Sequence, residues 1–182
     1  MNLKKTFLSI IAFGALGIFY AQNLTLTSED LIGQGTKKIE FSGFGCNGEN
    51  VSPELSWSGA PEGTRSFAIT VYDPDAPTGS GWWHWLVVNL PSDTKSLKSG
   101  AGNLEMGSLP KGALATINDY GISDFGGPCP PVGHGDHTYI FTIYALDVEK
   151  LDVTSNTNAA VVGYNINSHT LQKSSLVVYY KR

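Results

Sequence analysis

The sequence predicts a mainly antiparallel β-sandwich with one peripheral helix. Residues 67–72 and 137–146 alternate side chains between two faces, at the period of two that is typical of strands. The apolar run at residues 86–90 is typical of a buried strand. Glycine and proline recur between these stretches, and only residues 157–173 show helical spacing. Many strands separated by turns, with a single helix, indicate a sandwich.

The first 21 residues are predicted to be a signal peptide. Met1 to Lys5 supplies a basic start, and the mostly apolar residues 6–20 are too few to span a bilayer comfortably. Cleavage is expected after Ala21, and no cysteine lies near it to carry a lipid. We expect a periplasmic or secreted protein with no stable membrane anchor after cleavage, in which residues 22–182 form a single domain.

The charge balance argues against nucleic-acid binding. Without the leader, ten Lys and Arg face sixteen Asp and Glu, which gives a formal net charge of −6. Proteins that bind nucleic acid carry basic patches, and no such excess is present here.

Residues 73–85 follow the first strand and hold an unusual density of rigid and ionisable groups. They include Asp73, Asp75, Trp82 and His84. We expect this segment to be a loop that joins the strand at 67–72 to the next one, with its polar groups free to meet a ligand. Structural alternatives remain open, since either carboxylate can cap a turn and His84 can be a buried core histidine.

A second polar cluster precedes the strand at residues 137–146. A loop rich in glycine and proline, residues 126–136, leads into His137 and Tyr139, which share one face of that strand. If the strands that carry His84 and His137 lie close together, two imidazoles and two carboxylates converge beside aromatic walls. That composition is typical of a pocket for a small polar ligand.

The residue types in these clusters suggest the kind of ligand. Imidazoles and free loop N–H groups suit phosphate or a similar anion, carboxylates suit a cationic amine, and both together suit a zwitterion. No cofactor is expected. His134 and His137 form a possible metal pair, but a loop broken by glycine implies no third ligand, so no metal is expected either.

The C-terminal part is predicted to form a helix and a final strand. The helix is expected over residues 157–173, with Thr154 or Ser155 as its N-terminal cap and His169 in a packing or capping role. Residues 175–180 read as the last strand.

Two cysteines, Cys46 and Cys129, lie in glycine-rich loops of a chain that we expect to be exported. An even cysteine count in an oxidising compartment favours a disulfide, worth on the order of 4 kcal/mol for a loop of this length in the chain-entropy model. The alternative is two free thiols, one of them at the rim of the pocket.

Several motifs of the chain resemble the phosphatidylethanolamine-binding protein family, also called Raf kinase inhibitor-like proteins. The motifs are Asp73-Pro-Asp-Ala-Pro77, Trp82-Trp-His84-Trp, and Gly127-Pro-Cys-Pro-Pro131 leading to His137-Thr-Tyr139. The resemblance extends over nearly all of the chain after the leader. Its details are similar to the bacterial branch of the family.

The resemblance implies a large antiparallel sheet beside a smaller one, and a pocket for anions and phospholipid head groups. It assigns the pocket to the following residues: Asp73, Asp75, Trp82, His84, Pro130, Pro131, His137 and Tyr139. It also implies that members bind small anions, phosphorylated head groups or protein partners, and that several inhibit kinases or proteases. The chain departs from animal members at Cys129, where they have glycine, and after Ser174, where their C-terminal helix has no counterpart.

Two classes of function follow. The first, which we favour, is a non-catalytic binding protein that holds a small anion or a phosphorylated or zwitterionic head group and inhibits or modulates a partner protein. The second is a hydrolase that uses Asp and His as general base and acid. The chain has no Gly-x-Ser-x-Gly motif, so its nucleophile would have to be water.

Overall fold

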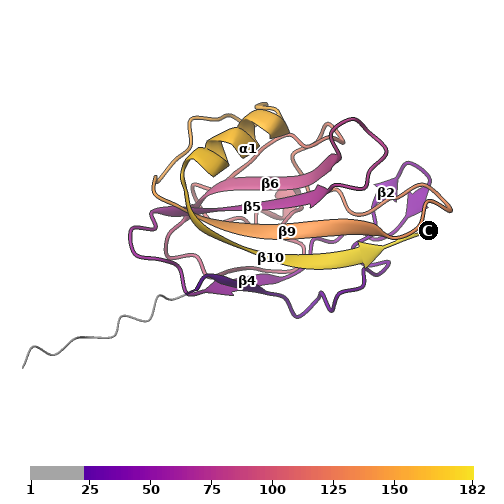
Figure 1. Cartoon of the computed structure of the whole chain (residues 1–182), viewed down its shortest axis with the longest axis horizontal. Coiled ribbons are helices and arrows are strands. Elements are labelled where there is room, and N and C mark those ends of the chain that lie inside the picture. The colour runs from indigo at the N-terminus through magenta and orange to yellow at the C-terminus, as the bar shows by residue number, and fades with distance from the viewer. Residues whose placement is uncertain (1–22) are drawn as a thin grey trace, which may run out of the picture.

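The computed structural model describes residues 23–182 (Figure 1), so the predicted signal peptide lies outside the described residues. Two sheets, a short hairpin, one α-helix and a 3-10 turn make up the regular structure of this part. The predicted β-sandwich with a peripheral helix is confirmed. Within residues 23–182, no helix is both long and apolar enough to cross a membrane.

The large sheet has five antiparallel strands in the order β10-β9-β5-β6-β8. Its strands are β5 (Ser66–Asp73), β6 (Trp82–Pro91), β8 (Leu114–Ala115), β9 (His137–Leu146) and β10 (Thr170–Tyr180). The three central strands are buried on both faces for most of their length, which explains why residues 86–90 lack alternation.

The remaining elements are short. The small sheet, in the order β1-β4-β7, contains β1 (Thr25–Thr27), β4 (Leu55–Ser58) and β7 (Ser96–Leu97). A separate hairpin consists of β2 (Ser42–Gly43) and β3 (Cys46–Asn47). The helices are the 3-10 turn η1 (Leu104–Met106) and α1 (Ala159–Ser168).

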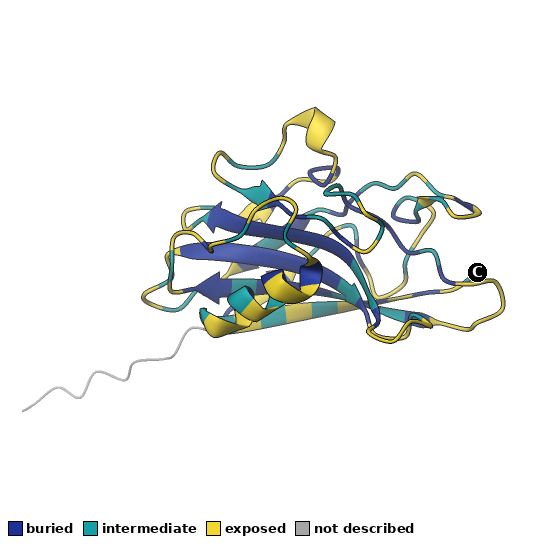
Figure 2. Cartoon of the chain, turned by 90° about the horizontal axis from the view of Figure 1, so that it is seen from above, coloured by how far each residue is buried: buried dark blue, intermediate teal, exposed yellow. Residues whose placement is uncertain are grey.

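The large sheet is the middle of three layers. On one face it packs against the small sheet, where the rings of Trp57 in β4 and Phe67 in β5 meet edge to face at 5.6 Å. On the other face, Ala68 and Leu86 pack against Val162 of α1. Figures 1 and 2 show α1 lying across the large sheet, and Figure 2 shows that burial is concentrated in the central strands. Successive side chains of β5 therefore alternate between two hydrophobic cores, one on each face of the large sheet.

The prediction that the helix runs to residue 173 is wrong. It begins after Asn158, whose side chain accepts the N–H of Val161, and it ends at Ser168. The chain then enters β10, which pairs with β9 from Thr170 onward. A long ladder of hydrogen bonds to β9 outweighs the weak helical preference of these residues, since tertiary pairing readily overrides local propensity.

The prediction that residues 73–85 form one loop is also wrong in its second half. The loop ends at Gly81, and β6 starts at Trp82, which pairs with Asp73. Gly81 adopts a φ of +67°, and a Cβ there would collide with the hydroxyl of Tyr72. Glycine therefore lets the chain turn tightly enough for the tryptophan-rich segment to join the sheet.

Candidate functional site

A cavity of about 200 Å³ lies at one end of the large sheet. Because β5 is antiparallel to both β6 and β9, the last residue of β5 lies beside the first residues of its two neighbours. Seven of the eight pocket residues implied by the resemblance line this cavity: Asp73, Trp82, His84, Pro130, Pro131, His137 and Tyr139. The structure thus brings together segments more than 60 residues apart in the sequence.

A β-bulge positions His84. In the pairing of β5 with β6, Val71 faces Trp85 and Tyr72 faces Trp83, so His84 has no opposite residue of its own. A bulge re-aims side chains locally, and bulges are common beside functional sites. It lets both Trp82 and His84 line the cavity.

Asp73 and His137 form a buried hydrogen-bonded pair. The Asp73 Oδ2 atom lies 2.7 Å from Nδ1 of His137, and each residue is only 2% exposed. Since a carboxylate accepts, Nδ1 of His137 donates. The other ring nitrogen of His137 lies 2.7 Å from Nδ1 of His134, an exposed residue. A chain of hydrogen bonds therefore connects the buried carboxylate to the surface.

His84 is isolated from solvent. Its Nδ1 atom lies 2.7 Å from the carbonyl oxygen of Gly126. Burial lowers the pKa of His84 to about 4, and the favourable contacts with Gly126 and Asp73 offset this only in part. The ring is therefore neutral at neutral pH.

Two further groups complete the wall of the cavity. The Tyr139 hydroxyl and the Trp82 indole N–H are buried, and neither has a hydrogen-bond partner among the described residues. Burial, reinforced by the nearby Asp73 carboxylate, raises the pKa of Tyr139 well above its usual range. The phenol consequently stays protonated and can donate a hydrogen bond.

Asp75 lies outside the cavity. It is exposed, and its carboxylate accepts the backbone N–H of Thr138 at 2.8 Å. Hydrogen bonds from the Thr138 side chain and backbone lower the pKa of Asp75. Its own N–H donates to Oδ1 of Asp73 at 2.8 Å. The residue therefore supports the loop that carries Asp73, as expected of a turn carboxylate.

Two aromatic residues of the cavity were not identified from the sequence. Tyr120 stacks on Phe41 with ring centroids 4.2 Å apart, and its hydroxyl donates to the carbonyl of Gly127 at 2.9 Å. Phe44 lines the mouth of the cavity although it is 71% exposed and has a φ of +51°. The positive φ of Phe44 is unusual for a bulky residue and marks it as a candidate site residue, but it can be seen only in the structure.

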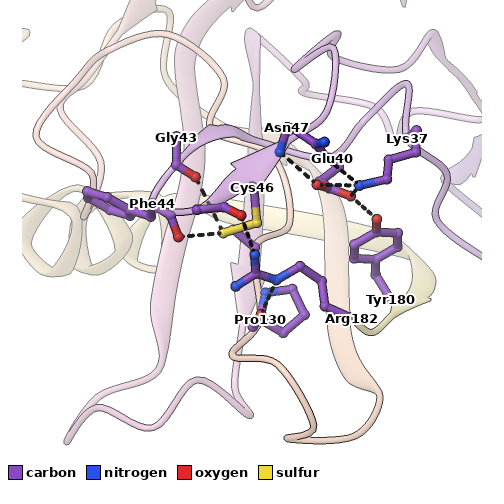
Figure 3. A network of polar contacts seen from close by, with 11 residues as sticks. Lys37, Glu40, Gly43, Phe44, Cys46, Asn47, Pro130, Tyr180 and Arg182 are labelled. Atoms are coloured by element: carbon purple, nitrogen blue, oxygen red, sulfur yellow. Dashed lines mark hydrogen bonds and ion pairs between the residues drawn. A yellow bond between two sulfur atoms is a disulfide. The ribbon is translucent and has the colours of Figure 1, made fainter.

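The predicted disulfide between Cys46 and Cys129 is present, with an S–S distance of 2.09 Å. It joins the hairpin β2–β3 to the loop that carries Pro130 (Figure 3). A second connection parallels it, because the guanidinium of Arg182 donates to the carbonyls of Pro130 at 2.8 Å and Gly45 at 2.7 Å. Two connections, the disulfide and Arg182, therefore hold the β2–β3 hairpin to the loop that carries Pro130.

A buried carboxylate anchors the base of the same hairpin. Glu40 accepts hydrogen bonds from the Asn47 N–H, the Lys37 ammonium and the Tyr180 hydroxyl (Figure 3). Burial raises the pKa of Glu40, but the hydrogen bonds from Lys37, Tyr180 and Asn47 outweigh it and lower the pKa below its usual range. Burial, reinforced by the bond to Glu40, raises the pKa of Tyr180 to about 12.

This geometry defines a small polar site with aromatic walls and a constrained rim. Within residues 23–182, no cluster of three or more His, Cys, Asp or Glu side chains is arranged to hold a metal ion. The polar groups are few and firmly oriented, as in sites that select a small ligand.

The sequence is similar to proteins of known family. A sequence model described as phosphatidylethanolamine-binding protein matches residues 32–181. YbcL of Escherichia coli is 47% identical, with 98% of this chain and 97% of YbcL covered. LppC of Mycobacterium tuberculosis, which is named as a lipoprotein, is 37% identical over 70% of this chain and 58% of its own length.

Solved structures give the same result. The crystal structure of Escherichia coli YbcL, described as a new member of the mammalian PEBP family, has a TM-score of 0.86 at 48% identity and covers 88% of this chain and 99% of its own. A phosphatidylethanolamine-binding protein homologue from Chlamydia trachomatis has a TM-score of 0.72 at 29% identity, with the same coverage. The sequence resemblance, the fold and the placement of the motif residues agree, and the chain belongs to the phosphatidylethanolamine-binding protein family.

Proposed function

We propose that this protein is a non-catalytic binding protein whose pocket holds a small anion or a phosphorylated or zwitterionic head group. The observation that carries the proposal is the convergence of Trp82, His84 and Tyr139 beside the Asp73–His137 pair in one cavity. Hydrogen-bonding groups in a water-restricted cavity favour a compact polar ligand.

The hydrolase alternative is less well supported by the same geometry. A general base needs a free ring nitrogen within reach of the water or hydroxyl that it deprotonates. In His137, Nδ1 is bonded to Asp73 and Nε2 lies 2.7 Å from His134. Both nitrogens of His137 are thus engaged. His84 has a free Nε2, but burial lowers its pKa to about 4, which makes it a weak base, so we propose binding rather than turnover.

We further propose that the protein works outside the cytoplasm and modulates a partner protein such as a kinase or a protease. The disulfide supports an oxidising compartment, as does the lipoprotein name of the relative LppC. Phe44 and Val132, which are 71% and 78% exposed, lie at or next to the cavity mouth and offer apolar surface for a protein contact. Inhibition assays with a panel of kinases and proteases, comparing the native protein with Phe44→Ala, test this part.

Calorimetric titration with phosphate and with phosphoethanolamine tests the pocket itself. We expect binding to the native protein and its loss in His84→Ala and in His137→Ala. His169→Ala is the matched control, since His169 caps α1, bonds Asp147 and lies outside the cavity. Unchanged binding in both pocket variants, with folding verified by circular dichroism, shows that the ligand binds elsewhere.

A further inference from the structure

A second cleft, of about 380 Å³, lies at the opposite end of the large sheet from the cavity described above. It is formed where β5 begins and where β6 and β9 end. Its lining includes three cationic side chains, Arg65, Lys111 and Lys150, and one carboxylate, Glu149. Three minus one leaves a local formal charge of +2, in a protein whose net charge without the leader is −6. Such a local excess of positive charge attracts anions.

A second β-bulge in β6 places Asn89 in this cleft. The register between β5 and β6 shifts between Phe67 and Ile69, so that Val88 and Asn89 together oppose the single residue between those two. Asn89 has a φ of +59°, the left-handed conformation that glycine usually adopts at such a bulge. The other bulge of the same strand positions His84 in the first cavity. Each end of β6 thus presents a polar side chain to a cavity by the same device.

The fold uses only half of the Asn89 amide. The residue is 8% exposed, and its Oδ1 atom accepts the N–H of Leu151 at 2.8 Å. That bond, together with the tolerance of asparagine for a positive φ, accounts for its structural role. The Nδ2 group has no hydrogen-bond partner within residues 23–182, and it is not enclosed, so a molecule in the cleft can reach it. A nearly buried amide with a free donor beside a cleft points to a ligand with acceptor atoms.

The cations around Asn89 are available to the same ligand. Arg65 is paired with Glu149 at 3.0 Å, so the one carboxylate of the cleft is already neutralised. Lys111 and Lys150 form no ion pair with any residue of the described part of the chain. They belong to different segments, one before β8 and the other after β9. Cations on separate loops match an anion whose charges lie on separate groups better than a single compact ion.

We propose that this cleft is a second binding site, for a small organic anion with two or three carboxylate groups. One carboxylate accepts a hydrogen bond from Asn89 Nδ2, and the others lie against Lys111 and Lys150. The site shares no residue with the cavity at the other end of the sheet, so the inference does not depend on the proposed function.

Calorimetry with tricarballylate and with acetate, at pH 7.5, tests the ligand class. We expect tricarballylate to bind the native protein at least tenfold more tightly than acetate, which has a single carboxylate. Its affinity is expected to fall several-fold as the ionic strength rises from about 0.02 M to about 0.2 M, because salt screens exposed charges. His84→Ala is expected to retain this binding. Equal affinities for the two ligands, or loss of tricarballylate binding in His84→Ala, overturn the inference.

Asn89→Asp separates the ligand contact from the structural role. Aspartate keeps an acceptor for the Leu151 N–H and tolerates a positive φ, but a negatively charged oxygen replaces the free donor. We expect native-like thermal melting and tricarballylate binding that is at least tenfold weaker. Sulfate is the compact dianion for comparison. If sulfate binds as tightly as tricarballylate and loses affinity equally in Asn89→Asp, the polycarboxylate class is wrong.

Two lysine variants complete the test at exposed positions, where folding is not at risk. Lys111→Gln and Lys150→Gln are each expected to weaken tricarballylate binding roughly three- to fivefold, as for an exposed charge pair. Lys173→Gln is the matched control, because Lys173 is an exposed lysine of β10 outside the cleft. Equal affinities in all three lysine variants overturn the inference, and this comparison decides the matter if Asn89→Asp does not fold.

Discussion

The Asp73 carboxylate and the His137 imidazole share a 2.7 Å hydrogen bond in the wall of the cavity, although 64 positions separate them in the sequence. The bond joins the last residue of β5 to the first residue of β9. The same bond therefore stabilises this end of the sheet and fixes two polar groups in the wall of the cavity.

We expect Asp73→Asn to lower the free energy of unfolding by about 2 kcal/mol, because a buried hydrogen bond to a charged group is weakened. Asp75→Asn is the matched control, since this neighbouring carboxylate is exposed and bonded to the Thr138 backbone. Urea unfolding at neutral pH measures both. Equal losses in the two variants contradict an energetic role for the buried pair.

The lowered pKa of His84 predicts that the protein loses stability in weak acid. Its pKa is about 4 in the folded protein, against 6.5 for the unperturbed group. The unfolded chain therefore binds a proton first, and stability that is fully present above pH 6.5 is lost as the pH falls towards 4. The full effect is about 3 kcal/mol.

The check is the unfolding free energy of the native protein and of His84→Gln between pH 7 and 4.5. We expect the native protein to lose more stability over this range than the variant, which lacks the titrating group. Parallel pH profiles show that burial of His84 does not shift its pKa.

Catalytic turnover is expected to be absent. Because both ring nitrogens of His137 are engaged and burial lowers the pKa of His84 to about 4, neither histidine is an effective general base, and we expect no hydrolysis of phosphoesters, carboxyl esters or peptides above background. The assay uses highly purified, metal-stripped protein, with and without added divalent ions. Activity that survives purification and disappears in His84→Ala contradicts the binding-protein proposal.

Strand alternation was sufficient to predict part of the site. It placed His137 and Tyr139 on one face of a strand, and in the structure both are buried and line the same cavity. The end of the first strand at Asp73 was also predicted correctly. These residues belong to long, regular strands, whose side-chain directions follow from a period of two.

The remaining features depend on contacts between distant segments, which produce no periodic pattern in the sequence. His84 lines the cavity because of a bulge, which breaks the alternation of β6. Tyr120 and Phe44 lie in loops whose positions depend on aromatic stacking, on the disulfide and on Arg182. The end of the helix was missed because β10 gains its stability from pairing with β9, a distant segment.

Reduction of the disulfide is expected to weaken ligand binding before the sheet unfolds. The bond closes a loop with a sequence separation of 83, for which the chain-entropy model gives about 4.5 kcal/mol. Because both cores lie within the sheets and α1, the strands retain their own packing when the hairpin loosens. Calorimetry with phosphate and thermal melts, each with and without reductant, measure the two effects. Identical affinity and melting temperature rule out the proposed role at the rim.

Arg182 and the disulfide restrain the same hairpin, so their effects on binding are expected to be non-additive. In the oxidised protein, Arg182→Ala removes bonds to Gly45 and Pro130 while the Cys46–Cys129 link still holds the rim. We therefore expect little change in phosphate affinity there, and a loss of at least several-fold when the same variant is reduced.

The neighbouring Lys181→Ala provides the control, because within residues 23–182 the side chain of Lys181 makes a single polar contact, an ion pair of 3.5 Å with the exposed Asp136. This variant is expected to bind phosphate like the native protein in both redox states. A full double-mutant cycle, with Arg182→Ala and reduction as its two changes, gives the coupling energy directly. If the two effects simply add, Arg182 and the disulfide act independently and do not constrain a common element.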